Sequence, residues 1–238
     1  ASTLEQRKEI DFTDALLQAA KLLEQNPNTY RYKYILVDEF QDMSMDKYKF
    51  LKSLRCKNPY TKFFCVGDDW QSIYRFSGSD MGLFTNFSQY FGYTEELRIE
   101  ATHRFGNPLL NKSSRFILKN PVQKEKNLIA DELRETQLDF VAIYDEVQWK
   151  TEIHDIIQKI PANESVNIIA RYKHNLFSLY PELEGQDKAG RRSYELRIEN
   201  HKIRCMTVHS AKGLEADHVI LINCDGGIYG FPSLVEDD

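Results

Sequence analysis

The chain has 238 residues, 42% of them hydrophobic and 28% charged, which is the composition of an ordinary globular protein. No run of about 18 apolar residues occurs, so no membrane span is expected. The formal net charge of −5 neither supports nor excludes DNA binding, because a basic groove can lie on an otherwise acidic surface. The four cysteines form no C-x-x-C pair, which argues against zinc and fits a reducing, cytoplasmic setting.

Apolar patterning predicts alternating helices and strands in the first part of the chain. The expected elements are a helix at 14–23, a strand at 34–37, a helix around 47–51 and a strand at 63–66. Asp11 or Thr13 would cap the first helix. The two strands are short, continuous apolar runs, as buried parallel strands are, and Gly67 ends the second.

The same alternation continues in the second part, after a soft boundary near residues 93–96. The expected elements are a strand at 140–144, a helix at 147–160 stopped by Pro161, and strands at 166–170 and 219–222. We interpret residues 120–137 as surface loop or short helix, and residues 182–192 as a turn-rich excursion. This order of elements predicts an α/β fold with a mainly parallel sheet.

Acidic residues follow the first predicted strand directly. Asp38 and Glu39 stand at its carboxyl end, which is the edge where open α/β sheets bind ligands. A Mg²⁺ ion that carries nucleotide phosphates needs one or two carboxylates, and a second carboxylate can orient or deprotonate an attacking water. Taken alone, this dipeptide would be interpreted as a solvated acidic turn.

The second predicted strand is followed by glycine, two acids, a glutamine and two aromatic residues. Gln71 could sense a γ-phosphate, and Tyr74 and Phe76 stand on either side of Arg75. Aromatic residues with a basic neighbour suit stacking on unpaired bases, which is worth ~1–3 kcal/mol per base. Without the preceding glycine, acids and glutamine, packing in a core or between domains would be the preferred interpretation.

A third candidate segment covers residues 206–215. Small hydroxyls, a lysine and a glycine in this segment can hold a phosphate backbone. Taken singly, His209 would more often be a structural hydrogen-bonding residue, and Lys212 a solvated surface charge.

In this order, the segments resemble the motifs of the UvrD/Rep family of superfamily 1 DNA helicases. Residues 38–42 resemble motif II, 67–76 motif III, 102–105 motif IV, 169–172 the following block and 207–215 motif V. Residues 10–14 match the run that often precedes motif II, and several phrases, such as Gly-Asp-Asp-Trp-Gln, are similar to the helicase IV branch. Five blocks in family order over nearly the whole chain are not expected by chance.

The resemblance implies a P-loop NTPase (RecA-like) fold with mainly parallel sheets and flanking helices. It implies two partial RecA-like domains, residues 1–92 and 93–238, which bind ATP and Mg²⁺ between them. Asp38 would coordinate Mg²⁺, Glu39 would position or activate the hydrolytic water, and Gln71 would contact the γ-phosphate. Arg104 would stabilise charge on that phosphate, and Gly213 and Glu215 would contact the nucleotide from the second domain.

The resemblance also implies a partner, single-stranded or duplex DNA, on which the family generally moves 3′ to 5′. The residues implied in DNA contact are Tyr74, Arg75, Phe76, Thr207, His209, Ser210 and Lys212. Coupling of ATP hydrolysis to movement along a single strand, with unwinding of the duplex ahead, is the implied activity.

Two family features are missing from the sequence. The phosphate loop Gly-x-x-x-x-Gly-Lys-[Ser/Thr] is absent and is expected upstream of Ala1, and motif VI is expected after Asp238. We therefore expect the chain by itself not to hydrolyse ATP. Three alternatives stay open: a non-catalytic DNA- or protein-binding module with this fold, the motor of a helicase–nuclease subunit, and an unrelated phosphate-binding α/β enzyme.

Overall fold

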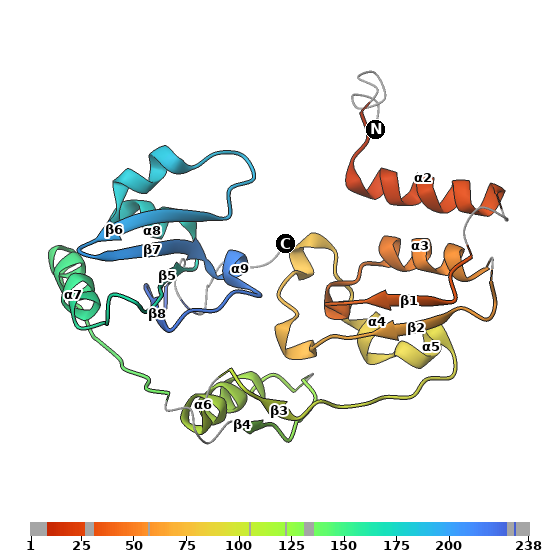
Figure 1. Ribbon diagram of the computed structural model, residues 1–238, viewed down its shortest axis with the longest axis horizontal. Coiled ribbons are helices and arrows are strands. Elements are labelled where there is room, and N and C mark those ends of the chain that lie inside the picture. The colour runs from red at the N-terminus through yellow and green to blue at the C-terminus, as the bar shows by residue number, and fades with distance from the viewer. Residues whose placement is uncertain are drawn as a thin grey trace. The chain divides into compact units, whose positions relative to one another are not determined.

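The computed structural model describes residues 9–26, 31–56, 58–104, 106–121, 123–130, 136–227 and 231. These residues form two compact units that divide between Asp139 and Phe140 (Figure 1). None of the helices in the described ranges has the length and apolar character needed to cross a membrane.

The first unit is built on two parallel strands, β1 (Tyr34–Val37) and β2 (Lys62–Cys65). Tyr34 pairs with Lys62 and Val37 with Cys65, so both strands end at the same edge. The helices of this part are α2 (Phe12–Gln25), α3 (Met45–Cys56), α4 (Met81–Thr85) and α5 (Phe87–Phe91). The predicted strands and helices are confirmed here, and Asp11 is the cap of α2, with Oδ1 accepting the Asp14 N–H at 2.7 Å.

One face of this sheet carries the core of the first unit. Alternate strand residues, among them Val37 and Phe63, pack against buried side chains that include Phe40, Leu83 and Phe91. Phe91 stacks on Phe87, and the rings of Phe40 and Phe63 meet it edge-on. On the opposite face the apolar side chains are exposed, and these are Tyr34, Leu36, Phe64 and Val66.

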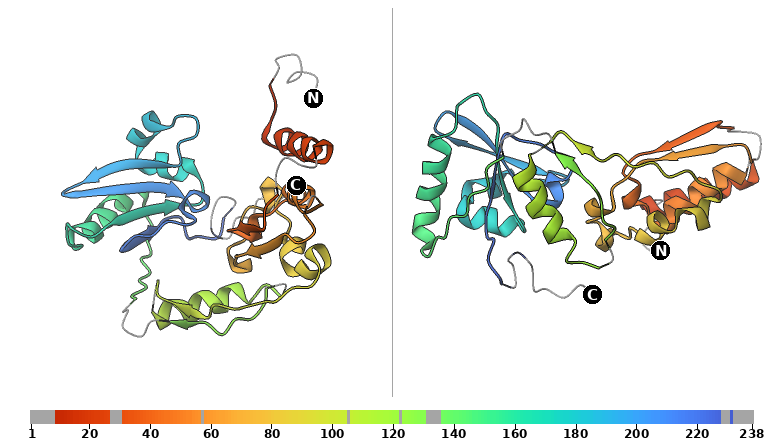
Figure 2. Two further views of the ribbon diagram at one scale, coloured as in Figure 1. Left: turned by 45° about the vertical axis from the view of Figure 1, so that its right-hand side comes forward. Right: turned by 90° about the horizontal axis from the view of Figure 1, so that it is seen from below.

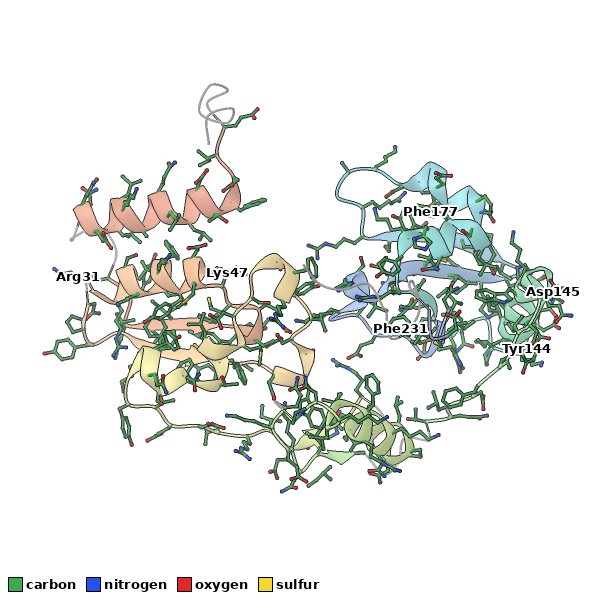
Figure 3. All side chains as sticks on the ribbon, turned by 180° about the vertical axis from the view of Figure 1, so that it is seen from behind. Arg31, Lys47, Tyr144, Asp145, Phe177 and Phe231 are labelled. Carbon is green, nitrogen blue, oxygen red and sulfur yellow. The ribbon has the colours of Figure 1, made fainter. Side chains whose placement is uncertain are left out.

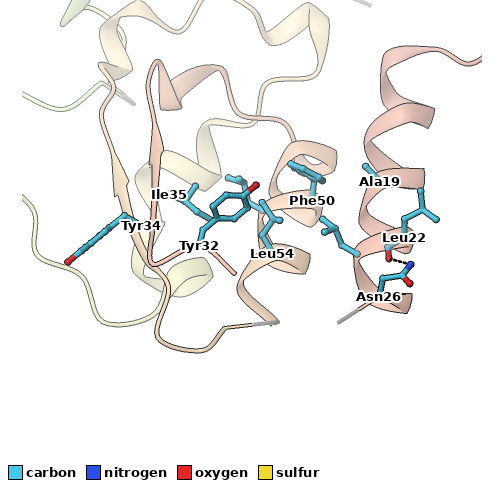
Figure 4. A pocket seen from close by; sticks show the side chains of 10 residues that line it. Ala19, Leu22, Asn26, Tyr32, Tyr34, Ile35, Phe50 and Leu54 are labelled. Carbon is cyan, nitrogen blue, oxygen red and sulfur yellow. Dashed lines mark hydrogen bonds between the residues drawn. The ribbon is translucent and has the colours of Figure 1, made fainter. Parts of the chain in front are cut away.

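A cavity of about 830 Å³ lies where α2 approaches α3 and β1 (Figure 4). Its walls are mainly apolar and include Leu22, Ile35, Phe50 and Leu54, while Asn26 hydrogen-bonds the Leu22 carbonyl at 3.1 Å. Asp38 and Glu39, at the other end of β1, do not line this cavity. It therefore forms no part of the predicted acidic site.

The rest of the first unit contains a small parallel pair of strands and one helix. These elements are β3 (Ala101–Thr102), α6 (Asn107–Ile117) and β4 (Ile129–Ala130). The chain between α5 and β3 has no regular structure, but the compact units divide later, between Asp139 and Phe140, and the boundary expected near 93–96 stays a prediction.

The second unit has a four-stranded sheet in the order β6-β7-β5-β8 (Figures 1 and 2). Its strands are β5 (Val166–Ala170), β6 (Ser193–Ile198), β7 (His201–Thr207) and β8 (His218–Leu221). Its helices are α7 (Glu146–Gln158), α8 (Lys173–Leu179) and α9 (Val208–Ala211), and a 3₁₀ helix follows α8 at Pro181–Gln186. β5 is parallel to β7 and β8, while β6 is antiparallel to β7.

The core of the second unit joins α7 and α8 to one face of this sheet. Ile157, Ile168, Leu176 and Ile203 are fully buried in one cluster, and β5, which lies between two parallel neighbours, is mainly hydrophobic. Phe177 of α8 meets Tyr194 of β6 edge-on, with ring centroids 5.2 Å apart (Figure 3). The predictions for 147–160, 166–170, 182–192 and 219–222 are confirmed, apart from end positions.

The strand predicted at 140–144 is wrong. These residues form no strand, and Phe140 and Tyr144 are 84% and 96% exposed. Tyr144 and Asp145 stand just before α7, at the rim of the second unit (Figure 3). An apolar run becomes a strand only when a neighbouring strand satisfies its backbone N–H and C=O groups, and among the described residues no strand pairs with 140–144.

Candidate functional site

The ends of β1 and β2 continue side by side into the acidic segments. The Val66 N–H donates to the Val37 carbonyl at 2.9 Å, and the Phe40 N–H donates to the Val66 carbonyl at 2.8 Å. Between these bonds, Asp38 and Glu39 turn away from the strand and are exposed to solvent. The sheet edge thus presents two carboxylates that a ligand in solution can reach.

Glu39 holds a left-handed backbone conformation, with φ 49° and ψ 44°. This conformation is uncommon for a residue with a side chain. It turns the chain into the short 3₁₀ helix Phe40–Asp42, and the Glu39 N–H donates to Asp38 Oδ1 at 2.8 Å. The two adjacent carboxylates are therefore fixed by a local turn of the backbone.

Gln41 connects this turn to the end of β2. Its side chain is 1% exposed, Nε2 donates to Glu39 Oε2 at 2.5 Å, and Oε1 accepts the Asp68 N–H at 2.9 Å. A Cβ added at Gly67 would lie 2.6 Å from Gln41 Oε1, so only glycine leaves room for this amide. The sequence analysis assigned no role to Gln41. The signal that could have found it is a polar residue next to Phe40, which is buried.

The Asp68 side chain accepts hydrogen bonds from two neighbouring residues of the second acidic segment. Its Oδ2 accepts Gln71 Nε2 at 2.8 Å, and its Oδ1 accepts the Trp70 N–H at 3.0 Å, which caps the 3₁₀ helix Asp69–Gln71. Burial favours a higher pKa for Asp68, but hydrogen bonds from Lys126 and Gln71 outweigh it and lower the pKa. Asp68 is therefore ionised at neutral pH.

The structure brings the predicted residues of motifs II and III together through hydrogen bonds. Glu39 and Gln71 are joined through Gln41, the Asp68 backbone and the Asp68 side chain. Asp38 and Glu39 were predicted as site residues because they follow an apolar strand. Gln41 and Asp68, which connect motif II to motif III, were not predicted as site residues.

The carboxylates of this edge fit Mg²⁺. Asp38 offers one exposed carboxylate, and Mg²⁺ bound through nucleotide phosphates keeps most of its waters and takes one or two protein carboxylates. When bound, Mg²⁺ would neutralise charge on the phosphates. Asp38 would hold it, with Glu39 beside it.

Tyr74 and Phe76 lie together close after the second acidic segment. Their ring centroids are 6.1 Å apart at an interplanar angle of 65°, around the 3₁₀ helix Arg75–Ser77. Phe76 is 73% exposed and Arg75 is also exposed, whereas Tyr74 is half-buried. The interpretation as core packing fails for Phe76, whose ring faces solvent.

Arg104 follows β3 and is exposed, and its backbone N–H donates to Thr102 Oγ1 at 3.5 Å. By its contacts this segment belongs to the first compact unit. The last residue of the motif IV block, Phe105, lies outside the described residues. The role of Arg104 at a phosphate stays a prediction.

In the second unit the predicted DNA-contact residues surround the short helix α9. Thr207 caps it, accepting the Ser210 N–H at 3.3 Å, and the two hydroxyls lie 3.0 Å apart. Burial and the nearby Arg171 charge lower the pKa of His209, so it is neutral at pH 7. Lys212 is half-buried at the end of α9.

The predicted nucleotide contacts of the second unit follow this helix. Gly213 has φ +78° and is exposed, as is Glu215. The left-handed backbone at Gly213 turns the chain from α9 towards β8, and a residue with a side chain would be strained there. Both roles stay predictions.

Comparison with known proteins gives matches along most of the chain. Residues 1–92 match the model of the UvrD/REP helicase N-terminal domain, and residues 186–238 match that of the UvrD-like helicase C-terminal domain. The chain is 37% identical over 224 residues to DNA helicase IV of Escherichia coli, which covers 94% of this chain and 31% of that protein. It is 29% identical over 163 residues to a probable DNA helicase II homolog of Rickettsia felis, covering 66% of this chain and 25% of that protein.

A third relative is DNA helicase II of Haemophilus influenzae, 34% identical over 124 residues, which are 50% of this chain and 17% of that protein. The chain thus spans less than a third of the length of these relatives. The matched domains have the P-loop NTPase fold, in agreement with the parallel strands and flanking helices. By its two matched domains and its ordered motifs, the chain belongs to the UvrD/REP family of DNA helicases.

Proposed function

We propose that this chain supplies part of the motor of an ATP-dependent DNA helicase or translocase that moves 3′ to 5′ on single-stranded DNA. The observation that carries the proposal is the polar network at the ends of β1 and β2. Through Gln41 and Asp68 it holds an exposed glutamate and a glutamine at one sheet edge. Relatives that match this chain are named DNA helicases.

In this function Glu39 orients and activates the water that attacks the γ-phosphate, and Asp38 holds Mg²⁺. The fixed turn at Glu39 supports this role, because a general base must be held at a defined position. Gln71 contacts the γ-phosphate, and Arg104 adds positive charge there. Gly213 and Glu215 contact the nucleotide from the second domain.

DNA binding rests on the aromatic pair of motif III and on the residues around α9. Phe76, with Arg75 beside it, offers an exposed ring on which a base can stack. Tyr74 supports that ring from its edge. Thr207, His209, Ser210 and Lys212 contact the phosphate backbone, where a neutral His209 acts as a hydrogen-bonding group and Lys212 as a charge.

The proposed functional domains are residues 1–92 and 93–238. The match to the N-terminal family model ends at residue 92, which supports this division. The compact units divide later, at residue 139, and side-chain contacts of residues 124–126 with residues 68–70 attach part of the later segment to the first unit. The free thiols Cys65, Cys205 and Cys224 support a reducing, cytoplasmic location.

The substitution Glu39→Gln in the full-length protein tests the motor assignment. DNA-stimulated ATP hydrolysis should fall by about a hundredfold or more, while binding of a labelled ATP analogue persists, because the amide cannot take a proton from water. Glu199→Gln is the matched control, since Glu199 shares the left-handed backbone (φ 49°) but lies in the β6–β7 turn. Unchanged hydrolysis with Glu39→Gln would refute the proposal.

A second substitution tests the stacking role. Phe76→Ala should weaken binding of a fluorescent oligothymidine by about tenfold, the loss expected for one stacked base. Phe116→Ala is the control, because Phe116 of α6 is 71% exposed and Phe76 is 73% exposed. Equal affinities for the two variants would exclude stacking on Phe76.

A further inference from the structure

A lysine outside the recognised motifs contacts the acids of motif III. Lys126 Nζ forms ion pairs with both Asp68 and Asp69. The same ammonium lies 4.9 Å from the centre of the Trp70 ring, a cation–π distance. One cation thus contacts three successive residues of the segment that follows β2.

The backbone near Lys126 contacts the same residues. The Lys124 N–H donates to Asp69 Oδ2 at 3.3 Å, and Trp70 Nε1 donates to the Lys124 carbonyl at 3.0 Å. Residues 124–126 therefore dock along residues 68–70, more than fifty residues away in the sequence. The docked segment lies beyond residue 92, where the N-terminal family match ends.

The two adjacent carboxylates of Asp68 and Asp69 explain why a cation is needed beside them. Asp68 and Asp69 are adjacent carboxylates, the side chain of Asp69 is 3% exposed, and that of Lys126 is 24% exposed. A carboxylate removed from water is costly unless it is paired, and two neighbouring carboxylates repel each other. Removing Lys126 would leave both acids without their shared partner.

Asp68 contacts both Lys126 and Gln71, so the position of Lys126 affects Gln71 through it. Its Oδ1 contacts Lys126 and its Oδ2 accepts Gln71 Nε2 at 2.8 Å. The two oxygens of the planar carboxylate rotate together about the Cβ–Cγ bond. A cation held on Oδ1 therefore restrains the direction from which Oδ2 accepts a hydrogen bond. The Gln71 amide therefore has a defined orientation only while Asp68 is held.

We propose that Lys126 is a positioning residue for ATP hydrolysis, which acts on Gln71 through Asp68 and couples the 124–126 segment to the γ-phosphate contact. This inference rests on the proposed function of Gln71. When the docked segment moves, Asp68 loses its cationic partner and keeps the Trp70 N–H, so the orientation of its bond to Gln71 is held less firmly. Hydrolysis thereby depends on a segment outside the N-terminal family region.

The test uses steady-state ATP hydrolysis by the full-length protein with saturating single-stranded DNA. Lys126→Met should lower kcat by about tenfold or more, since small misplacement of a catalytic contact is costly. The KM for ATP should change by less than about twofold, because the nucleotide is held mainly elsewhere. Lys126→Arg, which can pair with both acids, should retain most of the activity.

Lys124→Ala is the matched control. Lys124 is a neighbouring, exposed lysine whose contacts with Asp69 and Trp70 use backbone atoms only. Its kcat should stay within about twofold of wild type, because those atoms remain after the substitution. If Lys124→Ala and Lys126→Met lower kcat equally, the loss is not specific to the Lys126 ammonium and the inference is overturned.

A double-mutant cycle shows whether Lys126 acts through Gln71. Lys126→Met should lower kcat markedly in the wild type and hardly at all in a Gln71→Ala background, since coupled residues are non-additive. An equal factor in both backgrounds would overturn the inference. If Lys126→Met does not fold, as checked by circular dichroism, Asp68→Asn replaces it in the same cycle with the same expected result.

Failure of the inference is distinguishable from failure of the proposed function. If Glu39→Gln leaves hydrolysis intact, the proposed function fails and the inference falls with it. If Glu39→Gln and Gln71→Ala strongly lower hydrolysis but Lys126→Met does not lower it, the motor assignment stands and only the role of Lys126 is wrong.

Discussion

The close approach at Gly67 gives a stability prediction that can be worked out from distances. In Gly67→Ala the new Cβ would lie 2.6 Å from Gln41 Oε1, 2.9 Å from Phe84 Cε2 and 3.1 Å from the Gln41 backbone nitrogen. Gln41 cannot yield freely, because it is 1% exposed and its amide bonds both Glu39 and Asp68. The alanine must therefore displace a buried, hydrogen-bonded side chain.

The expected loss of unfolding free energy has two contributions. Overpacking of a well-filled site costs about 1–3 kcal/mol, and a weakened buried hydrogen bond costs about 1 kcal/mol more. The sum, about 2–4 kcal/mol, corresponds to a fall in Tm of roughly 5–15 °C for a domain of this size. The first compact unit should show this change.

Thermal unfolding followed by circular dichroism and by Trp70 fluorescence measures the change. Gly185→Ala is the control, because a Cβ added at Gly185 meets nothing within 4 Å. Its Tm should lie within about 2 °C of wild type, as for most surface substitutions. A Gly67→Ala protein as stable as this control would show that Gln41 moves easily and that the amide bridge is not rigid.

Three further outcomes follow from charges, thiols and packing. Because the pKa of Asp68 is lowered in the folded protein, its ionised carboxylate stabilises the fold above the unfolded pKa of about 3.9. This contribution is lost as pH falls through the folded pKa. In Asp68→Asn, Tm should therefore fall less steeply on acidification than in the wild type. Burial raises the pKa of Cys65 and Cys205 to about 12, and burial with the nearby Asp225 also raises that of Cys224, so accessibility decides the order: at pH 8 iodoacetamide should modify the exposed Cys224 before Cys65 or Cys205, as peptide mass spectrometry would show. Ile168→Ala, at a fully buried core position, should cost about 2–5 kcal/mol in urea unfolding of the second unit.

Local signals in the sequence were enough for the main strands and several helix ends. Asp11 caps α2 because a short acidic side chain before an apolar-periodic run can accept a backbone N–H, and that signal needs no knowledge of the fold. The run at 140–144 has the same apolar character as β5, but only β5 has neighbouring strands. Whether an apolar run pairs depends on distant residues, so the difference was not predictable locally.

The site residues also divide into those that the local sequence indicates and those that depend on distant residues. The position of Asp38 and Glu39 at the sheet edge was predictable, because they directly follow an apolar run that forms β1, whereas their roles stay predictions. Gln41 bonds the backbone of a residue 27 positions later, and Lys126 reaches acids more than fifty positions earlier. Nothing in the residues around Lys126 marks it, since a single lysine in a charged segment is usually solvated.

The left-handed turn at Glu39 has a consequence for protein engineering. A glutamate in that conformation costs about 1–2 kcal/mol compared with glycine, which adopts it without steric conflict. Selection for heat resistance should therefore favour glycine at position 39 and at position 199, where Glu199 has the same φ of 49°. At position 199 glycine would remove the 3.3 Å hydrogen bond from Gln158 Nε2, whereas at position 39 it would remove the carboxylate that bonds Gln41, so thermostable and active variants should differ at residue 39.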